Sequence, residues 1–446
     1  MNITDLKNKK ICILGLGLEN QALLNFLLKK NVKADYTICD ARAHKKLLTL
    51  CVPLQVKARK KNIKISCSHG QNYDKHLDKY DIIFRIAGYP LHNPNIIKAM
   101  MAGVNICSPT KLFFDLCPTK NIIGVTGTKG KGTTASLIYK IITDAGRTAY
   151  LGGNIGIAMF SFLEKIKETD WVVLELSSFQ IEDLHKSPHL AVITNFYPEH
   201  LAPADPNNPN YHKNLQAYWE AKTNIFAHQK KHDFLVAPKE LKNKLVGEII
   251  KAKIKYFNIT KLITPLVGNH NKKNIATAEV IAAIVGIKQN SVATSVKNFQ
   301  GLPHRLELVA QHQNIRYYND TFATTPEATI TALESFTPKK IILIAGGASK
   351  QSDFVILATT TKQYAKSVIL LPGEGSQEIK RQLRHIKYPN IIEVKNMPQA
   401  LGQAQAMACA GDIILLSPAC ASFGIFQNYK DRGQQFITEV KKLISH

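Results

Sequence analysis

The stretch IGVTGTKGKGTT, residues 123–134, combines glycines, lysines and hydroxyls in the manner of a loop that binds nucleotide phosphates. The common form of such a loop, G-x-x-x-x-G-K-[ST], ends in a hydroxyl that holds the Mg²⁺ of the nucleotide. Here Lys131 is followed by Gly132, and the first hydroxyl after it belongs to Thr133. The stretch predicts nucleotide binding, but it does not by itself define the class of enzyme.

Acidic and imidazole side chains follow the next two expected strands. Glu175 ends the apolar run WVVLEL, and His200 follows the run LAVITN. A carboxylate at the end of a buried strand is costly unless it serves a cation, and Mg²⁺ prefers one or two carboxylates together with phosphate oxygens. A lone histidine after a strand is usually structural, although His200 falls where a metal or substrate group would lie. Lys222, in YWEAKTNIF, lies on an expected helix, and the residues alone do not distinguish it from a surface lysine.

The N-terminal block has the pattern of a nucleotide-binding fold. The strand KKICILGLG meets a turn at Gly15 and Gly17, and the strand YTICD ends at Asp40. A glycine turn, a helix N-terminus and an acid at the end of the next strand are typical of a Rossmann-like domain that holds a nucleotide diphosphate. Because Asn20 stands where the third glycine is expected, a purely structural turn remains an alternative.

Short β-branched strands alternate with helical stretches along the whole chain, which is typical of α/β folds with parallel sheets. A chain of 446 residues is long enough for about three domains. We expect a Rossmann-like N-terminal domain over 1–108, a central P-loop ATPase domain with a mostly parallel sheet over 109–300, and a C-terminal Rossmann-like domain over 301–446. In such folds the functional groups gather at the carboxyl ends of the strands.

The composition excludes some classes of protein. The chain has 58 Lys and Arg against 33 Asp and Glu, a formal charge of +25. This charge suits nucleic acid, anionic small substrates or loose attachment to an acidic membrane surface. The lysines form short clusters without interleaved aromatics, which favours a solvated surface and argues against nucleic acid.

Neither targeting nor cross-linking signals are evident. The segment MNITDLKNKK lacks the apolar run of a secretory signal, and no stretch reaches the roughly 18 apolar residues of a membrane span. We therefore expect a soluble cytoplasmic protein. The eight cysteines form no C-x-x-C pair, so zinc and disulfide frameworks are not expected.

Ten ordered segments are similar to those of the Mur ligase family: GTKGKGTT, GGNIG, LELSSFQIE, TNFYPEH, EAKTNIF, GNHNKKNIATA, GLPHRLE, YNDTFATTPEA, GGASKQSDF and LSPACASFGIFQNYKDRG. The last one resembles the members that add glutamate to UDP-N-acetylmuramoyl-L-alanine. The resemblance implies that a substrate carboxylate attacks the γ-phosphate of ATP to give an acyl phosphate, from which the glutamate amine displaces phosphate. Such chemistry needs positioning and cations rather than a nucleophilic side chain.

The resemblance also implies roles for particular residues. The catalytic residues would be Lys131, Glu175, His200 and Lys222. Two Mg²⁺ sites would use Thr133, Glu175, His200 and, once carbamylated, Lys222. ATP would be bound by Gly127, Thr128, Lys129, Gly130, Lys131, Gly132, Thr133, Asn271, Asn274, Arg305 and Asp320. The UDP-linked substrate would be bound by Gly15, Gly17, Asp40, Arg42, Gly88, Asn154, Ser177 and Gln180. Glutamate would be bound by Thr324, Lys350, Ser422 and Tyr429.

The sequence departs from the family pattern in three places. Gly132 occupies the position of the Mg-binding hydroxyl, so Thr133 or a water would supply that ligand. The segment NDTFATTP stands where the family commonly has N-D-S-K-A-T-N, which places Phe322 where a lysine is usual. Together with Pro326, this change leaves open whether the amino acid is D-glutamate, as we expect, or L-glutamate. RIAG in place of S-P-G leaves the uridine contacts near Gly88 open.

Two further classes compete with this interpretation. A folylpolyglutamate synthase-like ligase shares the G-K-G-[ST] loop but should lack the N-terminal nucleotide-diphosphate domain. A non-catalytic, basic nucleotide-binding scaffold would not need Lys131, Glu175, His200 and Lys222 together. We expect a monomeric enzyme that uses ATP and Mg²⁺, with UDP-N-acetylmuramoyl-L-alanine and glutamate as its substrates.

Overall fold

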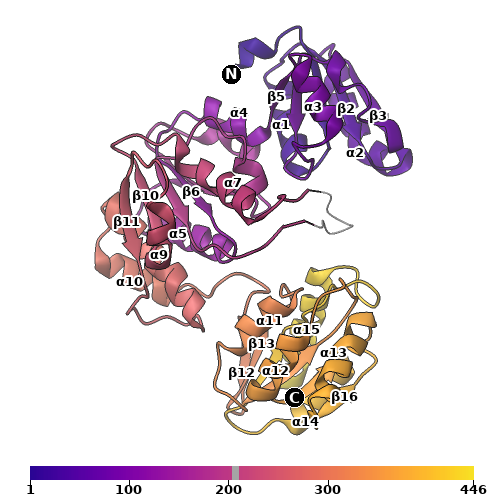
Figure 1. Ribbon diagram of the computed structural model, residues 1–446, viewed down its shortest axis with the longest axis vertical. Coiled ribbons are helices and arrows are strands. Elements are labelled where there is room, and N and C mark those ends of the chain that lie inside the picture. The colour runs from indigo at the N-terminus through magenta and orange to yellow at the C-terminus, as the bar shows by residue number, and fades with distance from the viewer. Residues whose placement is uncertain (203–209, 446) are drawn as a thin grey trace. The chain divides into compact units, whose positions relative to one another are not determined.

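The computed structural model describes residues 1–202 and 210–445. The chain forms two compact units, the first comprising Met1–Asn258 and Asn274–Val292 and the second Ile259–Lys273 and Ala293–His446. The first unit contains two sheets and the second contains one, and helices accompany each sheet (Figure 1). The expected α/β class, with three sheets of mostly parallel strands, is confirmed.

The N-terminal sheet has the strand order β3-β2-β1-β4-β5, and all of its neighbouring strands run parallel. This is the Rossmann-like arrangement expected from the glycine turn and the strand-end acid. Its strands are β1 (Lys10–Leu14), β2 (Asp35–Asp40), β3 (Ile65–His69), β4 (Ile82–Arg85) and β5 (Asn105–Cys107), and its helices are α1 (Leu18–Lys29), α2 (His44–Arg59), α3 (Pro94–Met101) and α4 (Pro109–Leu116).

The middle sheet has the order β11-β10-β9-β6-β8-β7 and is parallel throughout. Its strands are β6 (Ile122–Thr126), β7 (Ala149–Gly153), β8 (Trp171–Glu175), β9 (Leu190–Ile193), β10 (Phe234–Pro238) and β11 (Lys253–Phe257). The helices along this stretch are α5 (Lys131–Asp144), α6 (Ser178–Ile181), α7 (Leu215–Ala227), α8 (Lys242–Leu245), α9 (Asn269–Val285) and α10 (Gln289–Lys297). Because β6 lies between β8 and β9, the loop after β6 emerges between the strand of Glu175 and the strand that precedes His200.

The third sheet has the order β12-β13-β17-β14-β15-β16, in which only the pairing of β12 with β13 is antiparallel. Its strands are β12 (Glu307–His312), β13 (Ile315–Asn319), β14 (Ile341–Ala345), β15 (Ala365–Leu370), β16 (Ile391–Glu393) and β17 (Ile413–Leu416). Its helices are α11 (Pro326–Leu333), α12 (Val355–Tyr364), α13 (Glu374–His385), α14 (Met397–Met407) and α15 (Tyr429–Ile444).

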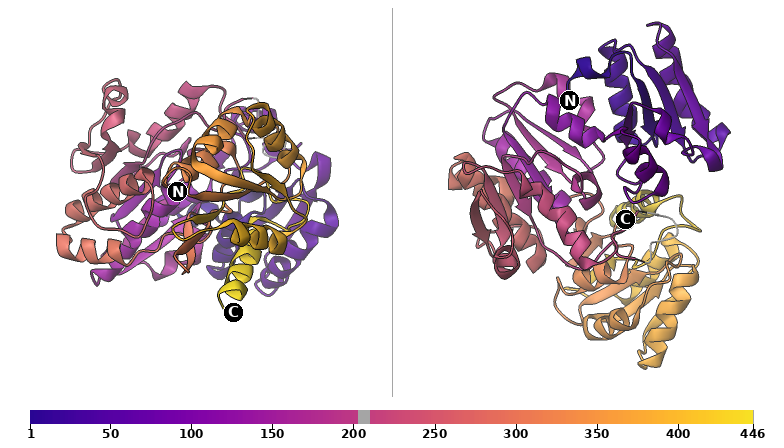
Figure 2. Two further views of the ribbon diagram at one scale, coloured as in Figure 1. Left: turned by 90° about the horizontal axis from the view of Figure 1, so that it is seen from below. Right: turned by 45° about the horizontal axis from the view of Figure 1, so that its top comes forward.

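Side chains of β14 show how the third sheet is buried. Leu343 belongs to one apolar cluster with residues of α11, α12 and α13, while Ile342 and Ile344 belong to another with residues of α14 and α15. Successive side chains of a strand point to opposite faces, so helices cover both faces of this sheet (Figure 2). Burial on both faces explains why its strands are continuous apolar runs rather than alternating ones.

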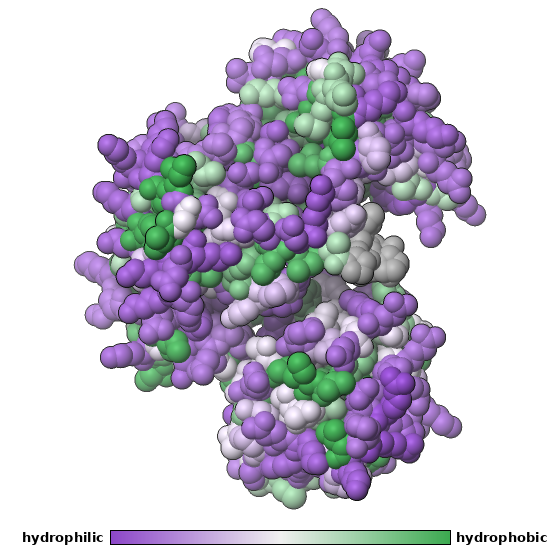
Figure 3. Space-filling view, in the orientation of Figure 1, coloured by the Kyte–Doolittle hydropathy of each residue, from purple (hydrophilic) through white to green (hydrophobic). Residues whose placement is uncertain are grey.

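The surface seen in Figure 3 is mainly hydrophilic, and its hydrophobic residues form small, separate groups. Within residues 1–202 and 210–445, every helix is too short or too polar to cross a bilayer.

Candidate active site

The phosphate-type loop follows β6 and depends on two glycines. Gly127 has φ 143° and Gly130 has φ 80°, values that L side chains rarely adopt. A Cβ on Gly127 would lie 2.0 Å from Oγ1 of Thr194, and one on Gly130 would lie 2.4 Å from Oδ1 of Asn274. The spacing of these glycines is therefore set by the close approach of two other segments to the loop.

Two residues at the end of β9 hold the main chain of this loop. Oδ1 of Asn195 accepts hydrogen bonds from the N–H groups of Thr128, at 3.1 Å, and Lys129, at 2.8 Å. Oγ1 of Thr194 and Nδ2 of Asn195 both donate to the carbonyl of Lys129, at 2.6 and 2.9 Å. Thr194 and Asn195 were not predicted from the sequence, although two hydrogen-bonding side chains directly after an apolar strand could have suggested them.

Two lysines converge on one carbonyl oxygen of the loop. Nζ of Lys131 donates to Gly127 O at 3.0 Å, and Nζ of Lys222 donates to the same oxygen at 2.9 Å. Nζ of Lys222 also lies 4.4 Å from the centre of the Tyr218 ring. Burial, and then the charge of Lys131, lowers the pKa of Lys222 well below its usual value. The site therefore favours the neutral amine of Lys222.

Two predicted residues meet at the carboxyl ends of β7 and β8. The side chain of Glu175 is buried, and its Oε1 accepts a hydrogen bond from Nδ2 of Asn154 at 3.0 Å. The main-chain N–H of Asn154 donates to the carbonyl of Glu175 at 2.8 Å. Gly153 allows this approach, because a Cβ there would lie 2.2 Å from Glu175 O. The sequence assigned these two side chains to a metal and to the UDP-linked substrate, and the structure places them in contact.

His200 follows β9 in a left-handed conformation, with φ 57°. Burial lowers its pKa, and the charges of Lys131 and Lys222 add to that effect against the opposing influence of Glu199. The ring of Phe179, on α6, meets the His200 ring edge to face with centroids 5.4 Å apart. His200 is thus held as a neutral imidazole, the form that can serve as a ligand.

Ser177 and Gln180 form the capping box of the short helix α6, in which Ser177 N donates to Gln180 Oε1 at 2.9 Å and Gln180 N donates to Ser177 Oγ at 3.3 Å. Nε2 of Gln180 donates to Oε1 of Glu19, at the start of α1, at 2.6 Å. Burial raises the pKa of Glu19, although this hydrogen bond opposes the rise. Gln180 therefore links the middle sheet's α6 to the N-terminal glycine turn.

The N-terminal turn is held by an ion pair. Oδ2 of Asp40 accepts from Leu16 N at 2.7 Å and from Arg42 Nη2 at 2.6 Å, and Arg42 Nη2 also donates to Leu16 O at 2.9 Å. Burial acts to raise the pKa of Asp40, but the hydrogen bonds from Arg42 and Leu16 outweigh it and lower the pKa. Gly15 has φ 80°, and a Cβ there would lie 2.5 Å from the end of the Ile86 side chain.

Arg85, in the RIAG segment, has a structural role that was not predicted from the sequence. It is the last residue of β4 and is fully buried. Its Nη1 donates to Tyr89 O at 2.6 Å, and its Nη2 donates to Glu182 Oε1 at 3.1 Å. Burial raises the pKa of Glu182 to about 7 despite the charge of Arg85. Arg85 therefore fixes the turn that contains Gly88 and ties it to the segment after α6.

In the second unit, Asp320 follows β13 and is buried. Its Oδ2 accepts from Ser417 Oγ at 2.8 Å, and its Oδ1 accepts from Leu306 N at 3.1 Å. Burial raises the pKa of Asp320 to about 7, and these hydrogen bonds and the charge of Arg305 only partly oppose the rise. Asp320 thus lies where the carboxyl ends of the adjacent strands β13 and β17 meet.

Phe322 makes contacts that a lysine could not. Cζ of Arg305 lies 3.8 Å from the centre of the Phe322 ring, a cation–π contact. The ring of Tyr429 meets that of Phe322 edge to face, with centroids 5.2 Å apart. Phe322 therefore bridges a residue assigned to ATP and a residue assigned to glutamate.

The remaining predicted residues are distributed over both units. Nζ of Lys350 donates to Oγ1 of Thr324 at 3.3 Å. Ser422 is buried in the segment after β17. Asn271 and Asn274 both lie on α9, where Nδ2 of Asn271 donates to Val267 O at 2.8 Å and Oδ1 of Asn274 accepts from Thr134 Oγ1 at 3.3 Å.

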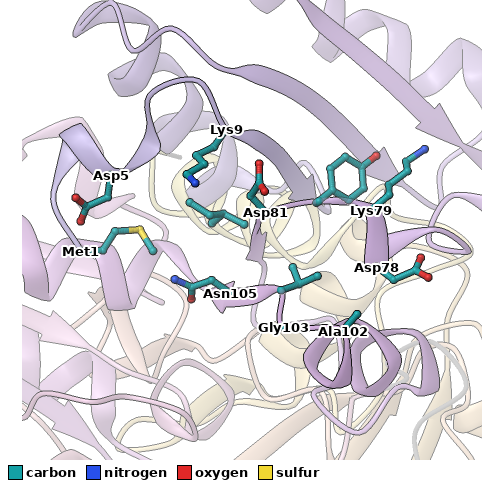
Figure 4. A pocket seen from close by; sticks show the side chains of 12 residues that line it. Met1, Asp5, Lys9, Asp78, Lys79, Asp81, Ala102, Gly103 and Asn105 are labelled. Atoms are coloured by element: carbon teal, nitrogen blue, oxygen red, sulfur yellow. The ribbon is translucent and has the colours of Figure 1, made fainter.

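A cavity of about 690 Å³ lies away from these groups, at the amino ends of β1, β4 and β5 (Figure 4). Charged side chains of both signs line it, among them Asp5, Lys9 and Asp81. The predicted nucleotide residues Gly15 and Asp40 lie at the opposite, carboxyl ends of this sheet. This cavity therefore does not mark the predicted nucleotide site.

Within the described residues, no group of three or more His, Cys, Asp and Glu side chains forms a site that could hold a metal by itself. One carboxylate beside a phosphate loop nevertheless suits Mg²⁺, which keeps waters and binds phosphate oxygens through one or two carboxylates. The buried carboxylate of Glu175, held by Asn154, satisfies that requirement.

Three domain families match the chain in order: Mur ligase MurD-like, N-terminal domain over residues 9–108, Mur ligase middle domain over 125–263, and Mur ligase, glutamate ligase domain over 304–420. The chain is 34% identical over 466 aligned residues to a UDP-N-acetylmuramoylalanine--D-glutamate ligase of Clostridium botulinum, strain Langeland, with 98% of both chains covered.

Solved structures with the same fold have low sequence identity. The MurF ligase of Thermotoga maritima, in complex with ADP, aligns with a TM-score of 0.58 at 14% identity over 99% of this chain and 97% of its own. E. coli FolC, in complex with DHPP and ADP, aligns with a TM-score of 0.53 at 17% identity over 75% of this chain and 91% of its own.

Along the chain, a Rossmann-like sheet is followed by a parallel sheet with a phosphate-type loop and then by a third α/β sheet, which is the domain order of the ATP-dependent ligases that the chain matches. The full-length match places it further: the chain belongs to the Mur ligase family.

Proposed function

We propose that this chain catalyses ATP-dependent formation of an amide between UDP-N-acetylmuramoyl-L-alanine and glutamate in peptidoglycan precursor synthesis. The alanine carboxylate attacks the γ-phosphorus of ATP, and ADP leaves. The amine of glutamate then attacks the acyl carbon, phosphate leaves, and the ammonium proton passes to solvent. The observation that carries this proposal is the convergence of Lys131 and Lys222 on Gly127 O beside the buried carboxylate of Glu175.

The proposed roles of the residues follow from their charges and their hydrogen-bonding groups. Lys131 lies at the start of α5, where its ammonium and the helix N-terminus both favour the β- and γ-phosphates. The ammonium of Lys131 offsets negative charge in phosphoryl transfer, which is mainly a matter of positioning and charge neutralisation. Asp40 and Arg42 bind the UDP part, and Asn154, Ser177 and Gln180 position the muramoyl-alanine.

Mg²⁺ is the metal that this donor set suits, and Glu175, His200 and Thr133 would hold it in the two proposed sites. When bound, it would neutralise charge on the phosphates. The neutral amine of Lys222 is also the form that reacts with CO₂, and the resulting carbamate would supply anionic oxygens where an ammonium would repel a cation.

In the second unit, Arg305 and Asp320 contact ATP, while Thr324, Lys350, Ser422 and Tyr429 receive the amino acid. Lys350 is the natural partner of a glutamate carboxylate. D-glutamate is the proposed amino acid, and L-glutamate is the alternative because Phe322 and Pro326 depart from the family pattern. The domains extend over 1–108, 109–300 and 301–446, and the enzyme acts as a cytoplasmic monomer.

The test is release of phosphate by the purified protein with ATP, Mg²⁺ and UDP-N-acetylmuramoyl-L-alanine, with D- and L-glutamate offered separately and the product identified by mass. Turnover with D-glutamate alone supports the proposal in full. Turnover with L-glutamate alone retains the mechanism and changes the amino acid, with residues 320–326 as the first segment to exchange. If neither supports turnover, the proposed reaction is wrong.

A folate-type ligase is the second candidate, because FolC shares the fold over 75% of this chain. The N-terminal sheet with its Asp40–Arg42 pair argues against it, since such a ligase needs no nucleotide-diphosphate domain. Glutamate-dependent phosphate release with a folate, but not with UDP-N-acetylmuramoyl-L-alanine, would favour this candidate.

A further inference from the structure

Arg432 is a buried arginine without an acidic partner among residues 1–202 and 210–445. It lies in the first turn of α15, and none of its surface is exposed. Burial lowers its pKa to about 10. The part of the chain that the structure describes gives Arg432 no salt bridge, whereas the buried Arg85 pairs with Glu182 and Asp183. A buried charge without a carboxylate is costly, so the contacts of Arg432 need an explanation.

The guanidinium of Arg432 donates hydrogen bonds to oxygen atoms of two separate segments. Nε donates to Thr321 Oγ1 at 2.9 Å, and Nη2 donates to Thr321 O at 3.0 Å. Nη1 and Nη2 each donate to Cys420 O at 3.2 Å, and Nη1 also donates to Ala421 O at 3.4 Å. One planar group therefore ties the segment after β13 to the segment after β17.

A third segment is joined to the same group. Ala348, just after β14, exchanges two main-chain hydrogen bonds with Ala421, at 3.0 and 3.2 Å. Gly347 lies so close that a Cβ there would be 2.2 Å from Ala421 O and 3.3 Å from Nη1 of Arg432. Oγ1 of Thr321 also donates to the carbonyl of Tyr429, at 3.2 Å. This bond connects the hydrogen-bond network to the first residue of α15.

These segments carry the residues proposed to receive the amino acid. Thr324 follows Thr321, Lys350 follows Ala348, and Ser422 follows Ala421, while Tyr429 begins α15. The planar fork of arginine can hold several carbonyl oxygens at fixed angles, which a lysine cannot do.

We propose that Arg432 is the positioning residue of the glutamate pocket: its guanidinium fixes the three strand-end segments that present Thr324, Lys350 and Ser422. Arg432 touches none of the reacting atoms, and its effect passes through the main chain at Thr321, Cys420 and Ala421. This inference rests on the proposed function for the identity of the amino acid, but the geometry it describes can be tested without turnover.

The first experiment compares the full-length Arg432→Lys variant with the wild type. Lysine keeps the charge but not the fork, so KM for glutamate should rise by at least about tenfold while KM for ATP stays within about twofold. Arg381→Lys is the matched control, because Arg381 is an exposed arginine of the same unit that pairs with Glu378. An equal rise in both KM values, or no rise in KM for glutamate, would overturn the proposal.

The second experiment measures hydrogen exchange of main-chain amides and does not depend on activity. In Arg432→Lys, the amides of Ala348 and Ala421 should exchange at least about tenfold faster, while those of β14 and β17 stay protected. Unchanged exchange at Ala348 and Ala421 would overturn the positioning role. If the wild type shows no ligase turnover but the variant shows this local pattern, the proposed function fails and the positioning role stands.

A milder pair of variants covers the case in which Arg432→Lys does not fold. Thr321→Val removes the hydroxyl that accepts from Nε, and Thr321→Ser keeps it. The Val variant should raise KM for glutamate severalfold, and the Ser variant should leave it within about twofold of wild type. If both variants behave alike, the hydrogen bond to Arg432 does not position the pocket.

Discussion

The N-terminal glycine turn and the central phosphate-type loop share one design, a parallel strand, a glycine turn and a helix, yet they differ in charge. The central loop gathers Lys131 and Lys222 at Gly127 O, and the first turn of α5 contains no acid. The N-terminal turn is held by the Asp40–Arg42 pair, and the first turn of α1 contains Glu19.

Under the proposed function, the same backbone geometry would serve two different anionic ligands. At the central loop, the ammonium of Lys131 and the helix N-terminus would act in the same direction on a polyphosphate. At the N-terminal turn, a carboxylate opposes the helix N-terminus, so the proposed binding of the UDP part would depend more on shape and on hydrogen bonds from residues such as Arg42.

Lys131→Ala should reduce turnover by at least about 10²-fold, because it removes a charge that neutralises the transferring phosphoryl group. Affinity for the UDP-linked substrate should stay within about twofold. Steady-state kinetics and calorimetric titration measure the two effects. The control is Lys140→Ala, because Lys140 lies in the same helix and pairs with Asp144 at the surface. Near-normal turnover in Lys131→Ala would contradict the proposed difference in charge between the two turns.

Replacing the first glycine of each turn by alanine should weaken the binding of a different ligand in each case. In Gly127→Ala the new Cβ meets Thr194 Oγ1 at 2.0 Å and Asn195 N at 3.1 Å, so the loop must move and ATP binding should be lost. In Gly15→Ala it meets only the Ile86 side chain, at 2.5 Å from Cδ1 and 2.7 Å from Cγ1, and this side chain can change rotamer.

The Gly15→Ala variant still carries the strain of a left-handed residue, about 1–2 kcal/mol. Affinity for the UDP-linked substrate should fall by about 5- to 30-fold, with ATP affinity unchanged. Titration with each ligand separately is the measurement. A loss of ATP affinity in Gly15→Ala would show that the two turns are not independent.

Much of this contrast could be read from the sequence, because it depends on local spacing. Glycines before Lys131 and an acid at Asp40 identify a turn and a strand end without knowledge of tertiary contacts. The short strands β3 and β5, with sequences ISCSH and NIC, were not identified, because neither has a continuous apolar run. Helix α5 starts at Lys131, directly after the turn at Gly130, and the helix expected to contain Lys222 is α7.

Residues whose partners are main-chain atoms far along the chain were not predictable. Arg85 and Arg432 look like ordinary charged residues, yet both are fully buried and donate to carbonyl oxygens that are 94 and 111 positions away in the sequence. Asn195 holds the phosphate loop across 66 and 67 positions of sequence. A short-range pattern contains no information on such contacts, which become visible only when strand order is known.

Asp40→Asn tests the ion pair of the N-terminal turn through pH. The pKa of Asp40 is lowered in the folded chain, so its stabilisation is present above the unfolded pKa of about 3.9 and is lost as pH falls through the folded pKa. At pH 7 the variant should lose about 1–2 kcal/mol, because Arg42 is partly exposed and solvent weakens the pair.

Thermal unfolding at several pH values measures this effect. The difference in Tm between wild type and Asp40→Asn should shrink as pH falls from 5 toward 2. Asp35→Asn, at the exposed amino end of the same strand, should show no such pH-dependent difference. A difference in Tm between wild type and Asp40→Asn that grows as pH falls would contradict the lowered pKa of Asp40.

Glu19→Gln should give the smallest effect and the finest test of the contrast. Glu19 places a carboxylate at the N-terminus of α1, where an anionic diphosphate is proposed to bind, and Gln keeps an oxygen that can accept from Gln180. Removing the charge should strengthen binding of the UDP-linked substrate by about 2- to 5-fold at pH 7. Because burial raises the pKa of Glu19, the difference in affinity between the two proteins should shrink as pH falls and the wild-type carboxylate gains its proton. Titrations at pH 7 and over a series of lower pH values measure this change. Weaker binding by Glu19→Gln at pH 7 would mean that the carboxylate serves the substrate directly, and the two turns would then differ in the ligand atoms they recognise rather than in the sign of their charge.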